Sequence, residues 1–155
     1  MKSLLKFIAH IGQAKTRPAT LIGTLPSRKS SVVALVLAKL LSGQKVNAID
    51  MAAEAQTSRV KDLIASLRRQ HAWGSISSDR IAVGTADGRV QWVTQYWLSE
   101  EVLALARTLQ NLDWVDKVFE ARRIQRLNKK SAQWRAKACN SKLVLKKGKS
   151  TGSQK

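Results

Sequence analysis

The chain has little of the material from which metal centres and disulfides are made. Cys139 is its only cysteine, and His10 and His71 are its only histidines. A single thiol cannot form an internal disulfide, and it excludes a thiolate zinc cluster. Neither histidine has a second histidine, cysteine or carboxylate at the spacing of metal ligands. We therefore expect a protein of a reducing compartment with no bound metal and no cofactor.

Long apolar runs are missing as well. The best apolar segment, residues 32–41, is interrupted by Lys39 and is much shorter than the stretch of about 20 residues that spans a bilayer. We expect a cytoplasmic protein without a membrane partner. Residues 1–12 are basic and amphipathic, as in a targeting presequence or a membrane-surface helix. A helix packed on the core explains the same pattern, and Lys6 breaks any apolar signal region, so we favour the packed helix.

The residue patterns of enzymes are also absent from the sequence. It has no Gly-rich phosphate loop, no paired histidines, no cysteine near a base, and no carboxylate cluster of the kind that a metal-dependent nuclease needs. Glu100 and Glu101 follow Ser99, where acids favour the first turn of a helix. We therefore expect no enzymatic activity.

Acidic residues are absent from both ends of the chain. Residues 1–49 hold eight basic residues and residues 121–155 hold twelve, and neither segment has an acid. Residues 50–116 have seven basic and nine acidic residues, so a nearly neutral middle lies between two cationic arms in a chain of net charge +18. Such arms attract phosphate. The charge pattern therefore predicts nucleic-acid binding, and it favours association with the nucleoid.

The distribution of apolar residues divides the chain into three parts. Residues 1–27 are expected to form a basic helix followed by a linker, because residues 13–27 are rich in Pro, Gly, Ser and Thr. Residues 28–115 hold the dense apolar positions of a folded domain. Residues 116–155 are expected to form a basic helix and a disordered tail, with residues 146–155 too polar to fold alone.

Two helices are predicted at the start of the domain. Residues 32–41 are apolar around most of a helix surface, so we expect a buried helix capped by Ser30 or Ser31. Asn47, with Asp50 three residues later, caps a second and shorter helix.

A third helix is predicted over residues 59–70, capped by Thr57 or Ser58. Four apolar residues form one stripe along it: Val60, Leu63, Ile64 and Leu67.

A β-hairpin follows these helices. Residues 76–83 and 89–98 are rich in β-forming side chains, and the Asp87-Gly88 pair between them is typical of a tight reversal. Ser99 then caps a fourth helix, whose helical spacing continues toward residue 138. Its apolar stripe is Val102, Leu105, Leu109 and Leu112.

Four motifs mark the boundaries of these elements: Leu40-Leu41-Ser42-Gly43, Asn47, Thr57-Ser58-Arg59-Val60 and Tyr96-Trp97-Leu98. With them, residues 28–109 resemble the winged helix-turn-helix family of DNA-binding domains, in particular the small proteins of this kind that phages, prophages and plasmids encode. The resemblance implies a mainly α fold with a β-hairpin wing, followed here by a long basic C-terminal helix and tail. Residues 52–55 lack the glycine that simpler helix-turn-helix proteins often have between the two helices.

The resemblance also implies a DNA-reading surface, because the start of the third helix faces base edges in this family. The residues expected there, with one on the wing, are Gln56, Thr57, Ser58, Arg59, Lys61, Arg68, Arg69 and Arg89. On the wing, Arg89 suits a minor groove. Asp62 either repels phosphate or holds Arg59 or Arg69 in place. The alternative for the basic side chains is a solvated helix face without function.

The acid-free C-terminal segment is expected to hold phosphates without reading sequence. Its candidate residues are Arg122, Arg123, Arg126, Lys129, Lys130, Arg135 and Lys137. The alternative is a tail that only solubilises the protein. Trp134 lies among these cations, where it suits either stacking on nucleic acid or packing on a partner chain. The other aromatic residues near the hairpin are expected mostly in the core rather than on bases: Trp73, Trp92, Tyr96 and Trp97.

The function we favour is a DNA-binding protein that reads duplex sequence and regulates transcription or a mobile element. The first alternative is a nucleic-acid binder without sequence preference, either an RNA-binding or annealing protein or an architectural DNA protein. The second is a protein-interaction module. In that case the stripe of Val102, Leu105, Leu109 and Leu112 is the face of a homodimer or of a partner complex.

Overall fold

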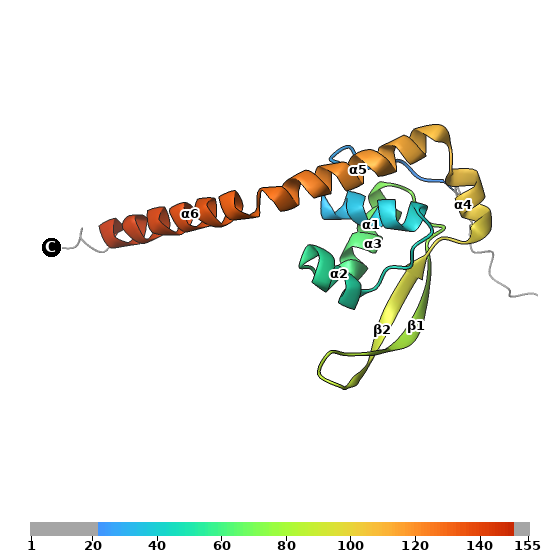
Figure 1. Cartoon of the computed structure of the whole chain (residues 1–155), viewed down its shortest axis with the longest axis horizontal. Helices are drawn as coiled ribbons and strands as arrows, with labels where there is room; N and C mark the ends of the chain where they lie inside the picture. Colours follow the sequence, from blue (N-terminus) through green and yellow to red (C-terminus); the bar gives the residue numbers. More distant parts are fainter. Residues whose placement is uncertain (1–21, 151–155) are drawn as a thin grey trace, which may run out of the picture.

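The computed structural model describes residues 22–150, with side chains as far as residue 142. This part of the chain is mainly helical and contains one two-stranded antiparallel hairpin, so the predicted combination of helices with a hairpin is confirmed (Figure 1). The elements are α1 (Val32–Leu41), α2 (Ala48–Ala55), α3 (Val60–Gln70), β1 (Ser77–Gly84), β2 (Val90–Trp97), α4 (Glu100–Ala106), α5 (Leu109–Leu127) and α6 (Lys129–Ser150). The N-terminal helix predicted over residues 1–12 lies outside the described residues.

Helix α1 lies at the centre of the core. The Ser31 hydroxyl accepts a hydrogen bond from the Ala34 amide at 3.2 Å and caps the helix. Nearly every side chain from Ala34 to Leu41 is buried, because α3 packs on one side of the helix and α5 on another. The expectation that this helix is buried on more than one side is confirmed.

The connection between α2 and α3 is a tight turn. The Asn47 side chain caps α2 by accepting from the amides of Ile49 at 2.9 Å and Asp50 at 3.0 Å. At the other end of α2, Gln56 adopts the left-handed conformation with φ 53°. Gln56 therefore makes the reversal that a glycine often makes in such turns.

The left-handed backbone at Gln56 should cost stability. Because glycine adopts positive φ without strain, Gln56→Gly should raise the free energy of unfolding by about 1 kcal/mol. The matched control is Gln70→Gly at the end of α3, where a helical backbone makes glycine unfavourable and should lower stability by a similar amount. Urea denaturation of both variants measures the difference, and a loss of stability in both would contradict the assignment of strain to Gln56.

The start of α3 differs from the prediction. The helix begins at Val60, the residue before it is Arg59, and no side chain caps it. The Thr57 hydroxyl instead accepts a hydrogen bond from the Arg59 amide at 3.3 Å, so it stabilises the turn and not the helix terminus. The prediction that Thr57 or Ser58 caps the helix was therefore wrong. The predicted apolar stripe is correct, with Val60, Ile64 and Leu67 buried and Leu63 packed against them.

The hairpin turns at Gly88, which has φ +82°, as the Asp-Gly pair predicts. Its base is fixed to the core because Val46, before α2, exchanges two backbone hydrogen bonds with Tyr96 at 2.9 and 2.8 Å. Of the aromatic residues considered, Trp73 and Tyr96 are core residues, whereas Trp92 is 59% exposed on the hairpin.

The fourth helix, predicted to continue toward residue 138, is broken twice and corresponds to α4, α5 and the start of α6. Helix α4 ends at Ala106, and Thr108 caps α5 by accepting a hydrogen bond from the Asn111 amide at 3.2 Å. The Asn111 side chain donates to the Ala106 carbonyl at 2.7 Å and closes the corner. Beyond it, α5 buries Trp114, Val115 and Val118 in the core.

Part of the predicted linker belongs to the domain. The Thr24 amide donates to the His71 carbonyl at 2.8 Å, and the indole of Trp73 donates to the Thr24 carbonyl at 2.9 Å. The indole of Trp114 donates to the Pro26 carbonyl at 3.3 Å. Residues 22–27 therefore form an N-terminal strap across the ends of α3 and α5.

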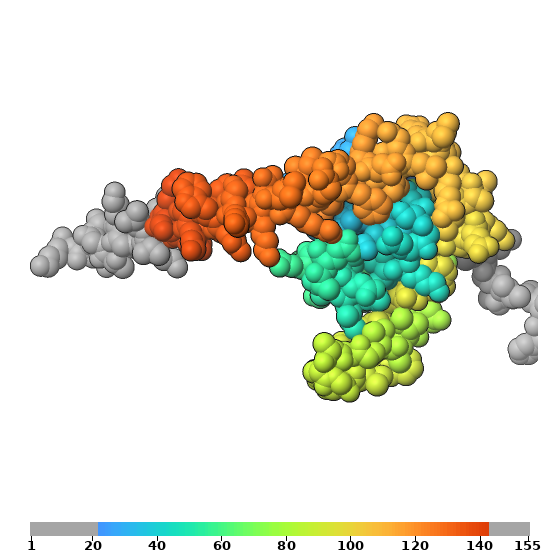
Figure 2. Space-filling view, viewed as in Figure 1, coloured from blue at the N-terminus to red at the C-terminus, as the bar shows by residue number. Residues whose placement is uncertain are grey.

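Helix α6 begins after a break at Asn128 and stands clear of the other elements (Figures 1 and 2). Between Lys129 and Lys142 its side chains are exposed, apart from a half-buried Ala138. The helix continues to Ser150, which is five residues into the segment for which we expected no structure; residues 151–155 lie outside the described part. Within the described residues, no helix combines the length and the apolar character that a membrane span requires.

Candidate nucleic-acid interface

The turn between α2 and α3 brings together five of the eight residues predicted for the DNA-reading surface. Gln56, Ser58, Arg59 and Lys61 are all exposed around the first turn of α3, and Thr57 is half-buried among them. They project from the body because α3 buries its opposite face on α1. The surface offers amide, hydroxyl, guanidinium and ammonium groups, which suit both base edges and phosphate.

Arg59 is already held by a neighbour in the free protein. Its Nε lies 2.9 Å from Asp62 Oδ2, and the two side chains are 80% and 61% exposed. Asp62 is therefore in position to hold Arg59, as one of the alternatives from the sequence predicts. An ion pair this exposed has little energy, so Arg59 can exchange Asp62 for a ligand at small cost.

Arg68 and Arg69 lie away from this cluster. They occupy the last turn of α3, about 13 Å along the helix from Arg59. Arg68 donates to the Ile76 carbonyl at 2.8 Å and ties the end of α3 to the start of the hairpin. Arg69 is exposed. The structure therefore divides the residues predicted along this helix into a group at its start and a separate pair at its end.

Arg89 is fixed at the hairpin tip by Asp87. Its Nη2 lies 2.6 Å from Asp87 Oδ2, and the hydroxyl of Thr85 donates to the same carboxyl group. The hydrogen bonds from Thr85 and then from Arg89 lower the pKa of Asp87 below its usual value. The carboxylate therefore remains ionised in mildly acidic solution, and it partly offsets the charge that Arg89 presents.

Another cation lies on the hairpin surface. The guanidinium of Arg80 is 5.8 Å from the ring centroid of the exposed Trp92, within the range of a cation–π contact.

The basic residues of α5 are engaged within the protein. Arg122 donates to the Ser30 carbonyl at 3.4 Å, and Arg123 makes two hydrogen bonds of 2.8 Å to Glu120. The hydrogen bonds from Arg123 lower the pKa of Glu120. The Nη2 of Arg126 lies 3.2 Å from Glu54. Each of these three cations therefore already has a partner within the protein.

The basic residues of α6 form a separate group. Among the residues with described side chains, none of them takes part in an ion pair: Lys129, Lys130, Arg135, Lys137 and Lys142. Trp134 is 71% exposed in their midst. This helix therefore presents positive charge and one aromatic ring with no acid to offset them.

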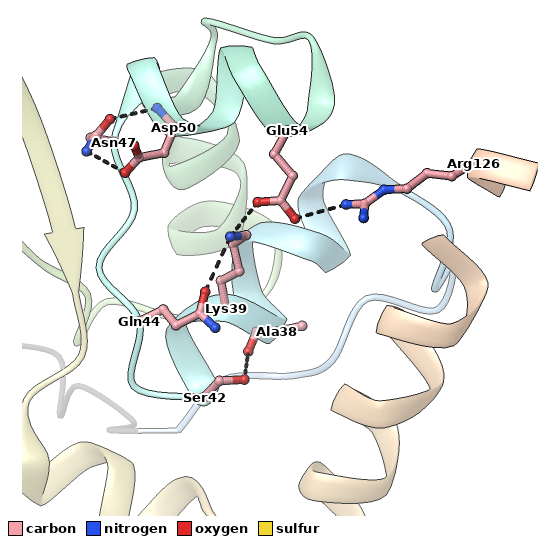
Figure 3. A network of polar contacts seen from close by, with 8 residues as sticks. All are labelled: Ala38, Lys39, Ser42, Gln44, Asn47, Asp50, Glu54 and Arg126. Atoms are coloured by element: carbon pink, nitrogen blue, oxygen red, sulfur yellow. Dashed lines mark hydrogen bonds and ion pairs between the residues drawn. The ribbon is translucent and has the colours of Figure 1, made fainter. Parts of the chain in front are cut away.

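Two ion pairs that share Glu54 link the helices α1, α2 and α5 (Figure 3). Glu54 of α2 contacts Lys39 of α1 at 2.5 Å and Arg126 of α5 at 3.2 Å. Glu54 and Lys39 could not be predicted as site residues from the sequence, because Arg126 lies 72 positions away in the chain from Glu54. Beside these ion pairs is a shallow pocket of about 360 Å³, with Gln56 and Lys129 also in its wall.

The predicted dimer stripe does not form one face. Val102 is buried, whereas Leu105, Leu109 and Leu112 are exposed by 52%, 89% and 42%. The break between α4 and α5 separates the four residues onto two helices, so the prediction of a single helical stripe was wrong. Three exposed leucines therefore remain on the two helices that meet at this corner.

The described residues contain no cluster of three or more His, Cys, Asp and Glu side chains that is suited to a metal ion. Comparisons with protein-family models, with curated protein sequences and with solved structures find no match to this chain.

Proposed function

We propose that the protein is a winged helix-turn-helix protein that binds duplex DNA and reads its sequence. In this proposal the hairpin is the wing, the start of α3 contacts base edges, and α6 holds the phosphate backbone. The protein then works in the cytoplasm on the nucleoid, as a regulator of transcription or of a mobile element. No catalytic step is assigned to it.

The observation that carries the proposal is the position of α6. A long helix without a single acid leaves the body next to the turn that presents α3, because Arg126, near the end of α5, contacts Glu54 near the end of α2. A purely solubilising tail has no reason to begin beside an exposed set of side chains suited to base edges. A polyanion lying across both surfaces meets unpaired cations along α6 and hydrogen-bond donors on α3.

Selection of bound duplexes from a random DNA library tests the proposal. The full-length protein is used near physiological salt, and successive rounds are sequenced. Enrichment of a short motif supports sequence reading. Retention of DNA without enrichment contradicts it and favours the general nucleic-acid binder described below.

Arg59→Ala should relax the preference at one or two base pairs and cost about 1–3 kcal/mol on the preferred duplex. A bidentate contact from this guanidinium to guanine accounts for both effects. The matched control is Lys117→Ala, which removes another exposed, ion-paired cation, this one from α5. Fluorescence anisotropy on the selected motif and on single-base variants measures both, and unchanged preference in Arg59→Ala would remove this residue from the reading set.

A second candidate function is nucleic-acid binding without sequence preference, to structured RNA or to DNA of any sequence. It is favoured by the pairing of Arg59 with Asp62 and of Arg89 with Asp87, which leaves α6 with the largest unpaired charge. Tighter binding to structured RNA than to duplex DNA at equal salt supports this function.

Self-association is a further part of the proposal. The exposed leucines at the α4–α5 corner, Leu105, Leu109 and Leu112, suit the face of a homodimer in place of the stripe first expected. A palindromic motif in the selection and a dimeric mass by light scattering support it, whereas a strict monomer contradicts it.

A further inference from the structure

The pocket between α2 and the α5–α6 junction has an excess of positive charge. Three cations line it, Arg122, Arg126 and Lys129, against the single carboxylate of Glu54. Glu54 is itself neutralised by Lys39 at 2.5 Å, and Lys39 does not line the pocket. The charge of Arg126 and Lys129 is therefore available to an anion.

Glu54 holds its two partners with unequal strength. The contact to Lys39 is short, and the two side chains are only 16% and 27% exposed. The contact to Arg126 is 3.2 Å long, and the Arg126 side chain is 61% exposed. Since exposed ion pairs contribute little energy, Arg126 can leave Glu54 while Lys39 keeps the carboxylate paired.

Arg122 forms a fixed wall of the same pocket. It donates to the Ser30 carbonyl at 3.4 Å and to Gln125 at 3.0 Å, and its Nε is buried without a hydrogen-bond partner in the described structure. This residue holds α5 against the start of α1. Its charge adds to the pocket, but its side chain is not free to move.

The pocket adjoins the reading surface. Gln56 lines it, and Thr57 and Ser58 follow directly in the chain. An anion bound here therefore lies beside the side chains that face base edges in the proposed function. Contacts to the backbone fix the register of a protein on a duplex, and contacts to bases then read the sequence.

We infer that this pocket binds one backbone phosphate of the nucleic acid, with Arg126 and Lys129 as its ligands and Glu54 as the group that Arg126 leaves. The inference rests on the proposed function, and it adds a defined phosphate site that couples α6 to the register of α3. Glu54 acts as a competitor, because it occupies Arg126 until the phosphate replaces it. Removing this carboxylate should therefore strengthen binding.

The test measures affinity for a random-sequence duplex DNA against salt, with four single variants and two double variants of the full-length chain. Arg126→Gln and Lys129→Gln should each weaken binding about tenfold and reduce the slope of log K against log salt by about 1. Because both residues hold one phosphate, the double variant should lose less than the product of the two effects. The control Lys117→Gln removes a cation of α5 that is paired with Asp113 and does not line the pocket, and it should change affinity by less than about twofold.

The fourth single variant is Glu54→Gln. It should raise affinity about two- to fivefold, because Arg126 then binds the phosphate without first breaking a partly exposed ion pair. This gain in affinity should vanish when Glu54→Gln is combined with Arg126→Gln. A merely structural role of Glu54 would not make the gain depend on Arg126. Thermal unfolding confirms that each variant is folded. Equal effects of Arg126→Gln and Lys117→Gln, or weaker binding by Glu54→Gln, overturn the phosphate site alone. Failure of the unaltered protein to bind DNA or RNA overturns the proposed function and the site together.

Discussion

A chain that ends after Asn128 should bind duplex DNA about 10³-fold more weakly than the full-length protein at low salt. The truncation removes nine basic residues and no acid. Each phosphate that these residues neutralise contributes about 0.9 to the slope of log K against log salt, so the slope should fall in step with the affinity. Anisotropy titrations between about 50 and 200 mM salt measure both quantities.

The fold should survive this truncation. The side chains from Lys129 to Lys142 are exposed except for half-buried Ala138, and none belongs to the hydrophobic core. The thermal midpoint should therefore stay within about 2 °C of that of the full chain. A companion variant keeps the helix and replaces Lys130, Arg135 and Lys137 with Gln. It distinguishes the effect of the charge of α6 on binding from the effect of removing the helix. Undiminished affinity in both variants would mean that α6 only solubilises the protein.

Gly23→Ala should lower the free energy of unfolding by about 3 kcal/mol, at the upper end of what overpacking costs. An added Cβ would lie 2.0 Å from the His71 carbonyl oxygen and 2.6 Å from Cδ1 of Trp73. Neither group can yield, because Trp73 is fully buried and the His71 carbonyl accepts the Thr24 hydrogen bond. The strap would have to lift off the core.

Gly74→Ala is the matched control, since an added Cβ there meets nothing within 4 Å. It should change stability by less than about 0.5 kcal/mol, as surface substitutions usually do. Urea denaturation compares the two variants. Equal stabilities would show that residues 22–27 contribute nothing to the folded domain.

The parts of the fold that follow from local chemistry could be predicted from the sequence. Ser31 and Asn47 cap helices because a short polar side chain reaches the nearby amides, and this depends on a few neighbouring residues only. The Asp87-Gly88 reversal is local in the same way. The buried stripe of α3 follows from helical periodicity. The residues proposed to read bases could be grouped at the start of α3 because the position of this helix follows from the same local patterns.

The features that could not be predicted are of two kinds. In some, one local signal overrides another, and in others the residues in contact are far apart in the chain. At the α4–α5 corner, apolar spacing runs unbroken past residue 108, but Thr108 and Asn111 close a turn there and override it. Gln56 takes a left-handed backbone that its residue type disfavours. The ion pair of Glu54 with Lys39 and Arg126 joins three helices, and no local pattern reveals such a contact. The basic residues of α5 were therefore assigned to phosphate binding without their internal partners.

Salt should affect helix α6 in two opposite ways, one through the stability of the helix and one through its binding to a polyanion. A helix without tertiary contacts is only marginally stable in water, and an excess of like charge along it opposes its formation. Added salt screens that repulsion and favours the helix, while the same salt weakens its attraction to a polyanion. A bound nucleic acid both screens the repulsion between the cations of α6 and acts as their ligand. Folding of this helix and its binding are therefore one coupled equilibrium, and dilute salt is the condition in which the partner has the greatest ordering effect on the chain.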